Sequence, residues 1–508
     1  MRKTAAAAAL ALLAAGCGGG AGEAGPATLT IAVGADPGLL DPATAVLGAT
    51  NSVLSLAYET LVRTSPDGKI IPGLAEKWEV KPDAVAFTLR QGVKCSDGST
   101  LTPAEVAANI NYLTDPANKS PLLGVLAPVG MKAAADAATV TVSTPEPFSF
   151  ILESTRLLFI VCGKGLQDRS LLAKATYGTS PYELKEVAPS DHYTFAKRQG
   201  SAAELPDQVV LKVVPNEQTA ANLLMSGDVN AATFFGPDRQ RVQAAPGVDK
   251  QEENVSNGQY FYHQGKDRPT NDVAVRKALT QALDLAELGR VSSGGTGKPV
   301  TGLVPGVPPC IGDSVSGHVP GLDPAAASAG LDAAGWTAGA DGIRAKDGKK
   351  LSLRLLYTTT RGPGVQAAAE YLAAAWKKIG VEVKLNGVID TKLAESLNVT
   401  QDWDVVWLPI GVTLPSQLVG FLSGPAAPKG ANFAHLANER YTELVAKAAT
   451  TPGAEGCKLW LEAESALIAN SDLVPVSTIT VLNATKGAKA AQQAGLFDPY
   501  SFRVEGSN

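Results

Sequence analysis

The chain has 508 residues, of which 45% are hydrophobic and 18% are charged. This length is too great for one compact module and fits two or three lobes with large buried cores. A formal net charge of −5, without blocks of lysine and arginine, argues against a nucleic-acid-binding protein, and the ordinary apolar content argues against a disordered one.

The first 26 residues have the pattern of an export signal followed by a tether. Met1-Arg2-Lys3 is basic, residues 5–15 form a short apolar run, and Cys17 opens a Gly-rich segment. The apolar run is too short to span a bilayer as a helix and is typical of a secretory signal peptide. Residues 1–16 as a signal and 17–26 as a tether resemble the lipobox region of bacterial lipoproteins. The resemblance implies a diacylglycerol on Cys17, which would hold the protein on the outer face of the cytoplasmic membrane or in the periplasmic space. The alternative is an ordinary secreted protein with an incidental cysteine.

Strand and helix patterns alternate along the rest of the chain. Short alternating runs predict strands, and Thr102, Pro103 and Glu105 mark a helix start as N-cap, first helical residue and capping-box partner. Gly and Pro cluster in a loop at 291–323. This order favours an α/β fold of mixed sheets flanked by helices. The predicted strands are 29–33, 84–90, 208–214, 259–262, 351–357, 381–385 and 403–408, and the predicted helices are about 49–62, from 102 onward, 216–225, 272–283 and 366–379.

Four further cysteines lie beyond Cys17, at 95, 162, 310 and 457. An even number in an exported chain suggests two disulfides, for which three pairings exist. We predict Cys95–Cys162 and Cys310–Cys457, one in each lobe, and the alternative is four buried free thiols. The cysteines form no CxxC pair or Cys/His cluster, so no metal site is expected from them.

A series of segments along the chain resembles the signature of one large family. It is the extracellular solute-binding protein family that includes dipeptide-, oligopeptide- and nickel-binding receptors of ABC importers. The resemblance covers about residues 28–480. The segments are 57–62 (AYETLV), 67–69 (DGK), 72–80 (PGLAEKWEV), 87–94 (FTLRQGVK), 96–102 (SDGSTLT), 178–182 (GTSPY), 223–229 (LLMSGDV), 275–284 (VRKALTQALD), 333–336 (AAGW) and 376–383 (WKKIGVEV).

The resemblance implies a two-lobed clamshell of the periplasmic-binding-protein kind. The first lobe would comprise residues 27–263, with an extra subdomain at about 66–170, and a returning segment at 475–508. The second lobe would comprise residues 264–474, and strands near 259–264 and 473–480 would form the hinge. A solute that contacts both lobes would favour the closed state, and an ABC permease with its ATPase subunits would recognise that state. The implied protein is a monomer without cofactor, metal or catalysis.

The loop after the predicted strand 403–408 bears on the choice of solute. Peptide-binding members of the family place an aspartate there for the ligand's ammonium group, but this chain has Val412-Thr413-Leu414 between Gly411 and Pro415. A buried ammonium without a counter-charge is costly, so we expect a capped, modified or uncharged ligand, with Thr413 among its contacts. Asp404 either carries the missing charge or is a strand-end carboxylate.

Other candidate ligand contacts follow from position. Tyr260 and Tyr262 lie on a proposed hinge strand, and each, like Trp407, either stacks on ligand or packs in the core. Arg361 follows a predicted strand and either grips a ligand carboxylate or is a surface arginine. The amides of Asn51 and Asn432 either bond a polar ligand or serve as cap and turn residues.

Enzyme signatures are weak in this sequence. The four histidines (192, 263, 318 and 435) lie far apart and form no HExxH motif, and GxSxG is absent. Residues 294–298 (GGTGK) resemble a phosphate-binding loop, but Ser292 and Pro299 stand where the motif requires Gly and Ser or Thr. We therefore predict a non-enzymatic receptor for a peptide or peptide-like solute. The alternatives are a receptor for a nickel chelate, through a histidine such as His435, or for another small metabolite, and a secreted hydrolase.

Overall fold

The computed structural model describes residues 27–44, 48–65, 68–306, 309–493 and 495–506. The predicted signal peptide, the tether and Cys17 lie outside these residues. Within the described part of the chain, no helix combines the length and the apolar character that a membrane span requires.

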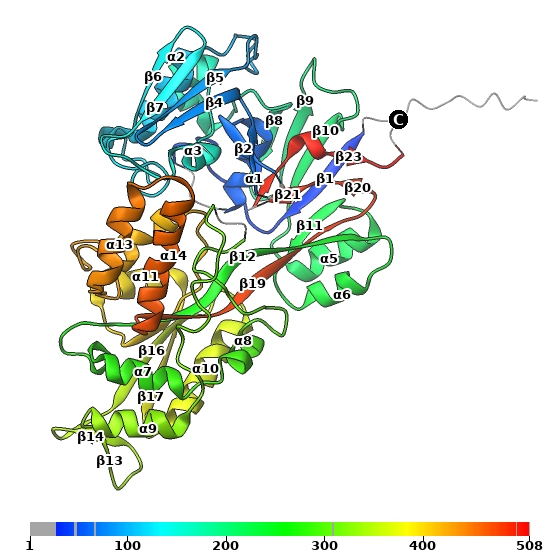
Figure 1. Ribbon diagram of the computed structural model, residues 1–508. Coiled ribbons are helices and arrows are strands. Elements are labelled where there is room, and N and C mark those ends of the chain that lie inside the picture. Colours follow the sequence, from blue (N-terminus) through cyan, green and yellow to red (C-terminus); the bar gives the residue numbers. More distant parts are fainter. Residues whose placement is uncertain (1–26, 45–47, 66–67, 307–308, 494, 507–508) are drawn as a thin grey trace, which may run out of the picture.

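One sheet of ten strands runs through the molecule, and its two central strands connect an upper and a lower half (Figure 1). We call these the first and second halves. The strand order is β17-β16-β18-β12-β19-β11-β1-β10-β9-β8, with β12 and β19 antiparallel to each other. The strands are β1 (Thr28–Val33), β8 (Tyr182–Ala188), β9 (His192–Lys197), β10 (Gln208–Val213), β11 (Ala231–Phe234), β12 (Asp249–Tyr262), β16 (Ser352–Thr358), β17 (Glu382–Val388), β18 (Val405–Trp407) and β19 (Leu473–Thr485).

Helices cover both faces of this sheet. In the first half they are α1 (Gly48–Ala57), α4 (Gly163–Gln167), α5 (Glu217–Ser226) and α6 (Asp238–Ala244). In the second half they are α7 (Val273–Gln281), α8 (Leu285–Ser292), α9 (Pro324–Ala333), α10 (Pro363–Lys377), α11 (Asp390–Glu395), α12 (Val419–Leu422), α13 (Glu439–Ala449) and α14 (Gly453–Ala469). Short strands form four small sheets. Three of them have two strands each: β2 (Val62–Thr64) with β3 (Ile70–Pro72), β20 (Ala488–Lys489) with β23 (Arg503–Val504), and β21 (Gln492–Gln493) with β22 (Leu496–Phe497). The fourth contains β13 (Thr337–Ala338), β14 (Arg344–Lys346) and β15 (Lys349–Lys350).

A second sheet forms a separate layer near the N-terminal end of the fold. Its order is β4 (Ala75–Lys81), β5 (Ala84–Leu89), β7 (Thr139–Ser143) and β6 (Lys132–Asp136), with α2 (Pro103–Thr114) against it and α3 (Ile151–Ser154) nearby (Figure 1). The predicted capping box starts α2: Thr102 N donates to Glu105 Oε2 at 2.8 Å, and Glu105 N donates to Thr102 Oγ1 at 3.2 Å. Alternate residues of β5 and β7 fill a core of its own with α2.

Most predicted elements are present, and the differences have local causes. The predicted helix 49–62 ends at Ala57, because the next carbonyls, of Glu59, Thr60 and Leu61, accept hydrogen bonds from residues 160, 74 and 75. The predicted strand 259–262 is the end of the much longer β12, whose earlier residues pair with β19. The predicted strand 403–408 shortens to Val405–Trp407.

Both predicted disulfides are confirmed. Cys95 bonds Cys162, and Cys310 bonds Cys457. The first bond links the segment after β5 to the start of α4, and the second links the loop before α9 to α14. Each bond therefore fixes an irregular segment to a helical one.

Asp404 takes the second of its two predicted roles, that of a strand-end carboxylate. It lies just before β18 and is 3% exposed. It accepts hydrogen bonds from Arg354 N and Nε at 2.8 Å each, and from Arg268 Nη1 at 3.2 Å. Two guanidinium groups already balance this carboxylate, so it supplies no free charge for a ligand.

His263, at the end of β12, is a buried neutral imidazole. Its Nδ1 accepts a hydrogen bond from Gly265 N at 2.9 Å, and its Nε2 hydrogen-bonds Gln401 Oε1 at 2.7 Å. The rings of Trp403 and His435 lie 4.8 and 4.6 Å from it. Burial lowers the pKa of His263 to about 4.

This lowered pKa predicts a loss of stability in mild acid. An unfolded histidine has a pKa of about 6.5, so between pH 6.5 and about 4 the unfolded chain binds more protons at this position. The stabilisation is complete above pH 6.5 and is lost as the pH falls towards 4. Urea titrations over this range should give His263→Asn a smaller loss than the wild type, by up to about 3 kcal/mol. His318→Asn, at an exposed histidine, is the control, and equal acid losses in His263→Asn and the wild type would contradict the assignment.

Candidate ligand-binding site

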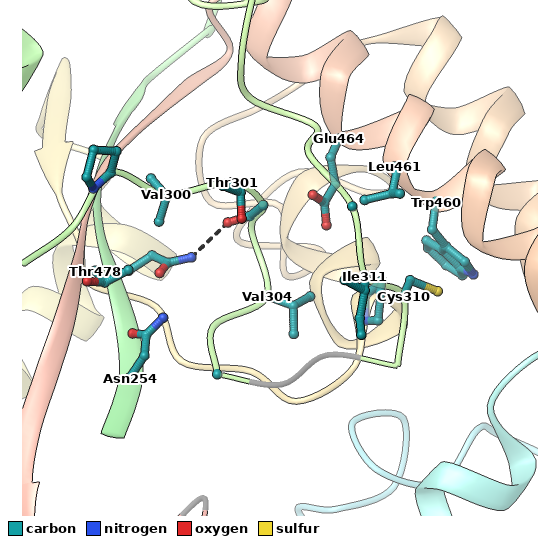
Figure 2. Close-up of a pocket in the computed structure, with 16 residues that line it drawn as sticks. Asn254, Val300, Thr301, Val304, Cys310, Ile311, Trp460, Leu461, Glu464 and Thr478 are labelled. Carbon is teal, nitrogen blue, oxygen red and sulfur yellow. Dashed lines mark hydrogen bonds between the residues drawn. The ribbon is translucent and has the colours of Figure 1, made fainter. Parts of the chain in front are cut away.

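A pocket of about 230 Å³ lies beside the two central strands, where they meet α14 (Figure 2). Four parts of the chain form its wall: the middle of β12 and of β19, the loop before α9, Pro415 and one face of α14. The lining residues that Figure 2 labels are Asn254, Val300, Thr301, Val304, Cys310, Ile311, Trp460, Leu461, Glu464 and Thr478.

The loop in this wall, residues 299–306 and 309–314, which we call the pocket loop, is held from three sides. The Cys310–Cys457 disulfide ties it to α14. Ser314 N donates to Thr301 O at 2.8 Å and so closes the loop on itself. Just before it, Lys298 O accepts a hydrogen bond from Thr478 N of β19 at 2.8 Å, and Lys298 N donates to Thr478 Oγ1 at 2.9 Å. The pocket is therefore preformed, although no regular secondary structure builds this part of its wall.

Glu464 is the charged group inside the pocket. It is 6% exposed, and its Oε2 accepts hydrogen bonds from Leu303 N at 3.0 Å and Ser314 Oγ at 2.5 Å. Burial raises the pKa of this carboxyl group. Among the described residues, no lysine, arginine or histidine forms an ion pair with it. In Figure 2 its carboxylate faces the interior of the pocket.

Asn257 on β12 faces the pocket loop from the opposite side. It is 1% exposed, and its Nδ2 donates to Gly302 O at 2.9 Å and Leu303 O at 3.3 Å. Its Oδ1 is buried and has no hydrogen-bond donor among the described residues, and the same holds for Oδ1 of Asn254, three residues earlier. Buried polar atoms are nearly always paired in folded proteins, so these acceptors give this side of the pocket a polar surface.

A second contact region joins the small β4–β7 layer to the second half. Arg156, just after α3, donates from Nη1 to Thr64 Oγ1 at 3.3 Å and from Nη2 to the backbone oxygen of Thr413 at 3.4 Å. Ser149 N donates to Ala449 O, at the C-terminal end of α13, at 2.8 Å. The ring of Phe150 lies 5.6 Å from that of Trp460, which also lines the pocket. The layer therefore contacts the elements that surround the pocket.

Three of the predicted ligand contacts lie in the core. Tyr260 and Tyr262 are 0% exposed and pack against each other and against Trp376 of α10. Trp407 is 1% exposed and belongs to the same buried cluster. The structure thus places all three in the packing role that was the alternative to ligand stacking, and none of them lines the pocket.

The remaining predicted contacts are dispersed. Asn432 is buried and holds its own loop, because Leu436 N donates to its Oδ1 and its Nδ2 donates to Leu436 O, both at 2.9 Å. Arg361 is exposed and lies 3.5 Å from Asp390 and 3.4 Å from Pro409 O. Thr413 is half-buried, with its backbone N donating to Gln417 Oε1 at 2.8 Å. Asn51 is half-buried on α1, in the first half.

The polar pocket residues were missed in the sequence, although one signal was present. Trp460, Ala463, Glu464, Leu467 and Ile468 follow the spacing of one helix face, and all five are buried. Glutamate is rarely buried unless its carboxylate is paired, so a glutamate within the apolar face of a helix is a candidate functional residue. Asn254 and Asn257 carried no comparable signal, because the β-bulge between Asn254 and Ser256 alters which face of the strand each residue occupies.

Comparison with known proteins identifies a family. The family model described as bacterial extracellular solute-binding proteins, family 5, middle part, matches residues 69–427. Similar curated proteins include protein XP55 of Streptomyces lividans, 29% identical over 71% of this chain and 66% of the relative. The periplasmic murein peptide-binding protein MppA of Escherichia coli K12 is 25% identical over 82% of this chain and 80% of the relative. The nickel-binding periplasmic protein of the same organism is 28% identical over 66% of each chain.

Solved structures show the same fold. The ABC transporter substrate-binding protein CtaP of Listeria monocytogenes superposes with a TM-score of 0.82 at 19% identity, over 94% of this chain and 99% of that one. NikA of Brucella suis, solved in complex with Fe(III)-EDTA, superposes with a TM-score of 0.79 at 22% identity, over 94% and 100% of the two chains. At these identities the likeness establishes the architecture.

Proposed function

The chain belongs to family 5 of the bacterial extracellular solute-binding proteins, and we propose that it captures a peptide or peptide-like solute outside the cell and delivers it to an ABC permease. The family consists of solute-binding receptors, and the matched region covers most of the chain. In this proposal the protein works by closing around a solute, without making or breaking bonds.

The position of the pocket on the connecting strands carries the proposal. Asn254 and Asn257 lie on β12 and Thr478 lies on β19, and these two strands link the halves of the sheet. Glu464 and the pocket loop belong to the second half, while Arg156 reaches Thr413 from the β4–β7 layer. A solute bound at this junction touches groups whose relative position changes when the halves rotate about the strands. Only such differential contact can shift an open–closed equilibrium.

The rest of the receptor follows from the sequence. The lobes are residues 27–263 with 475–508, including the extra subdomain at about 66–170, and residues 264–474. The signal peptide directs export, and the lipid on Cys17 anchors a monomeric protein on the outer face of the cytoplasmic membrane. Thr413, Arg361 and Asn51 are retained as candidate contacts in the closed state, because none of the three is fully buried in the structure.

A receptor for a nickel chelate is the second candidate, and the likeness to the nickel-binding protein of E. coli favours it. The described residues contain no group of three His, Cys, Asp or Glu side chains placed to hold a metal ion. In this alternative, a small-molecule chelator supplies the metal ligands and the protein recognises the chelate.

Solution scattering with a panel of solutes tests the receptor function. We expect the radius of gyration to fall when the right solute is added at saturation, because the lobes close. Thermal unfolding should show a stabilisation of about 2.7 kcal/mol when the free solute is 100-fold above its Kd. Peptides and metal chelates form separate arms of the panel, and mass spectrometry of the co-purified solute guides the choice within each. Unchanged scattering together with steady consumption of one panel compound would contradict the proposal and favour an enzyme.

A further inference from the structure

Residues 148–150, directly before α3, reach from the β4–β7 layer into the second half. Phe150 is 4% exposed and belongs to the buried cluster of the second half that includes residues of α13 and α14. Its ring lies 5.6 Å from that of Trp460 on α14 and 6.3 Å from that of Phe148. Phe148 packs against both this cluster and the core of the layer. An aromatic side chain that comes from the layer is therefore part of the core of the second half.

Ser149 adds hydrogen bonds between the same two parts of the molecule. Its backbone N donates to Ala449 O at 2.8 Å. Its hydroxyl lies 3.0 Å from Ala449 O and 3.1 Å from Thr451 O, and it also contacts Ala448 O. These carbonyl groups lie at the C-terminal end of α13, where the last carbonyls of a helix lack partners within it. Figure 1 shows α3 close to the upper ends of α13 and α14, in agreement with these contacts.

The layer itself is fixed to the first half. The Cys95–Cys162 disulfide joins the segment after β5 to the start of α4. Arg198, directly after β9, donates from Nη2 to Cys95 O at 2.8 Å, and Lys164 N of α4 donates to Asp97 Oδ2 at 2.9 Å. Because these ties are covalent and polar, the layer moves with the first half. A rotation of the halves about β12 and β19 must therefore withdraw Phe150 from the second half.

Withdrawal of Phe150 has a cost that does not depend on any solute. It exposes the phenylalanine ring and the face of Trp460 that this ring covers, and exposure of apolar surface to water is unfavourable. We call the arrangement in which this contact is made the closed state. Trp460 also lines the pocket, so one indole ring contacts both Phe150 and the space where a solute would bind.

We propose that residues 148–150 form a latch that favours the closed state before a solute is bound. The proposal rests on the receptor function proposed above and identifies what sets the balance between open and closed molecules in the empty receptor. Part of the empty population is closed by the latch, and a solute closes the rest. The apparent affinity for a solute rises with the share of molecules that are already closed, so loss of the latch weakens binding at an unchanged pocket.

Small-angle scattering of the empty full chain, freed of co-purified solute by dialysis, tests the latch. We expect Phe150→Ala to have a larger radius of gyration than the wild type, because burial of a phenylalanine side chain favours the closed state about tenfold or more. Ser149→Ala should change the radius in the same direction by a smaller amount, and it provides the test if Phe150→Ala does not fold. A radius equal to that of the wild type in the folded Phe150→Ala variant, or in Ser149→Ala if it alone folds, would overturn the proposal.

Phe497→Ala is the matched control, because Phe497 is 7% exposed and packs in the core of the first half. It should melt at a lower temperature than the wild type and keep the wild-type radius in the folded state. An increase as large as that in Phe150→Ala would show general loosening of the fold and would overturn the latch.

The latch and the receptor function fail in different measurements. The latch is tested on empty protein, whereas the receptor function is tested by adding solutes to the wild type. If the radius of the wild type falls with a solute but empty Phe150→Ala matches the empty wild type, the latch is refuted and the receptor function stands. If Phe150→Ala is more open but no solute closes either protein, the two halves move as proposed and the receptor function is refuted.

Discussion

Replacement of Asp472 by alanine is expected to lower the free energy of unfolding by about 3 to 5 kcal/mol. Asp472 lies directly before β19 and is 0% exposed. Its carboxylate accepts hydrogen bonds from Arg276 Nη2 at 3.0 Å, Gln264 Nε2 at 2.8 Å and Asn438 Nδ2 at 2.7 Å. Removal of the carboxylate leaves the Arg276 guanidinium, 2% exposed, without the counter-charge that it pairs with.

The effect should reach the hinge, because Asp472 fixes the start of a connecting strand. Arg276 also donates to Ser471 O and Asn470 O, so the pair ties α7 to the turn that leads into β19. Chemical denaturation followed by circular dichroism measures the change. Glu287→Ala is the control: Glu287 also pairs with an arginine, Arg290, but here both side chains are exposed, by 40% and 65%. It should cost less than about 1 kcal/mol, and equal losses in the two variants would refute the argument from burial.

The sequence was most informative where local chemistry determines structure. The capping box at Thr102 and Glu105 starts α2, and Gly227 ends α5 in a left-handed conformation with φ of 91°. Side chains within a few residues of each other supply these signals, so no knowledge of the tertiary fold is needed. The ordered family segments identified the fold itself for the same reason, since each one is a local pattern.

Side-chain roles on the central strands could not be predicted in this way. Tyr260 and Tyr262 pack in one buried cluster of the second half, and Phe261 between them packs in the other. Both faces of β12 are therefore covered there, and alternation along the strand cannot distinguish a face towards a ligand from a face towards the core. The prediction for these residues depended on which elements cover the strand, which is a property of the tertiary structure.

The pocket residues were hidden for a related reason. Glu464 and Asn257 are 207 positions apart in the sequence, yet both bond Leu303. The pocket loop that joins them has no regular secondary structure and is fixed by a disulfide and by side-chain hydrogen bonds. Sequence periodicity does not describe such a loop, so only the fold could show that an asparagine on a strand and a glutamate on a helix face one pocket.

Loss of the Cys310–Cys457 disulfide should affect both stability and ligand binding. The two cysteines are 147 residues apart, so the bond greatly restricts the unfolded chain, and its removal is expected to cost about 2 to 5 kcal/mol. Cys310 also belongs to the pocket loop, and Cys457 lies on α14 near Trp460. Without the bond, the pocket loop becomes ordered only when the solute binds. The entropy lost in this ordering makes the free energy of binding less favourable.

The double variant Cys310→Ala with Cys457→Ala is therefore expected to melt at a lower temperature and to bind the solute identified by mass spectrometry about five- to tenfold more weakly than the wild type. Cys95→Ala with Cys162→Ala is the matched control, because its disulfide closes 67 residues and lies away from the pocket lining. This control should also lose stability, but its affinity should match that of the wild type. If both double variants lose affinity equally, general loosening of the fold explains the effect and the pocket loop has no special role. If neither loses affinity, the hydrogen bonds of Asn257 and Glu464 suffice to hold the loop in place.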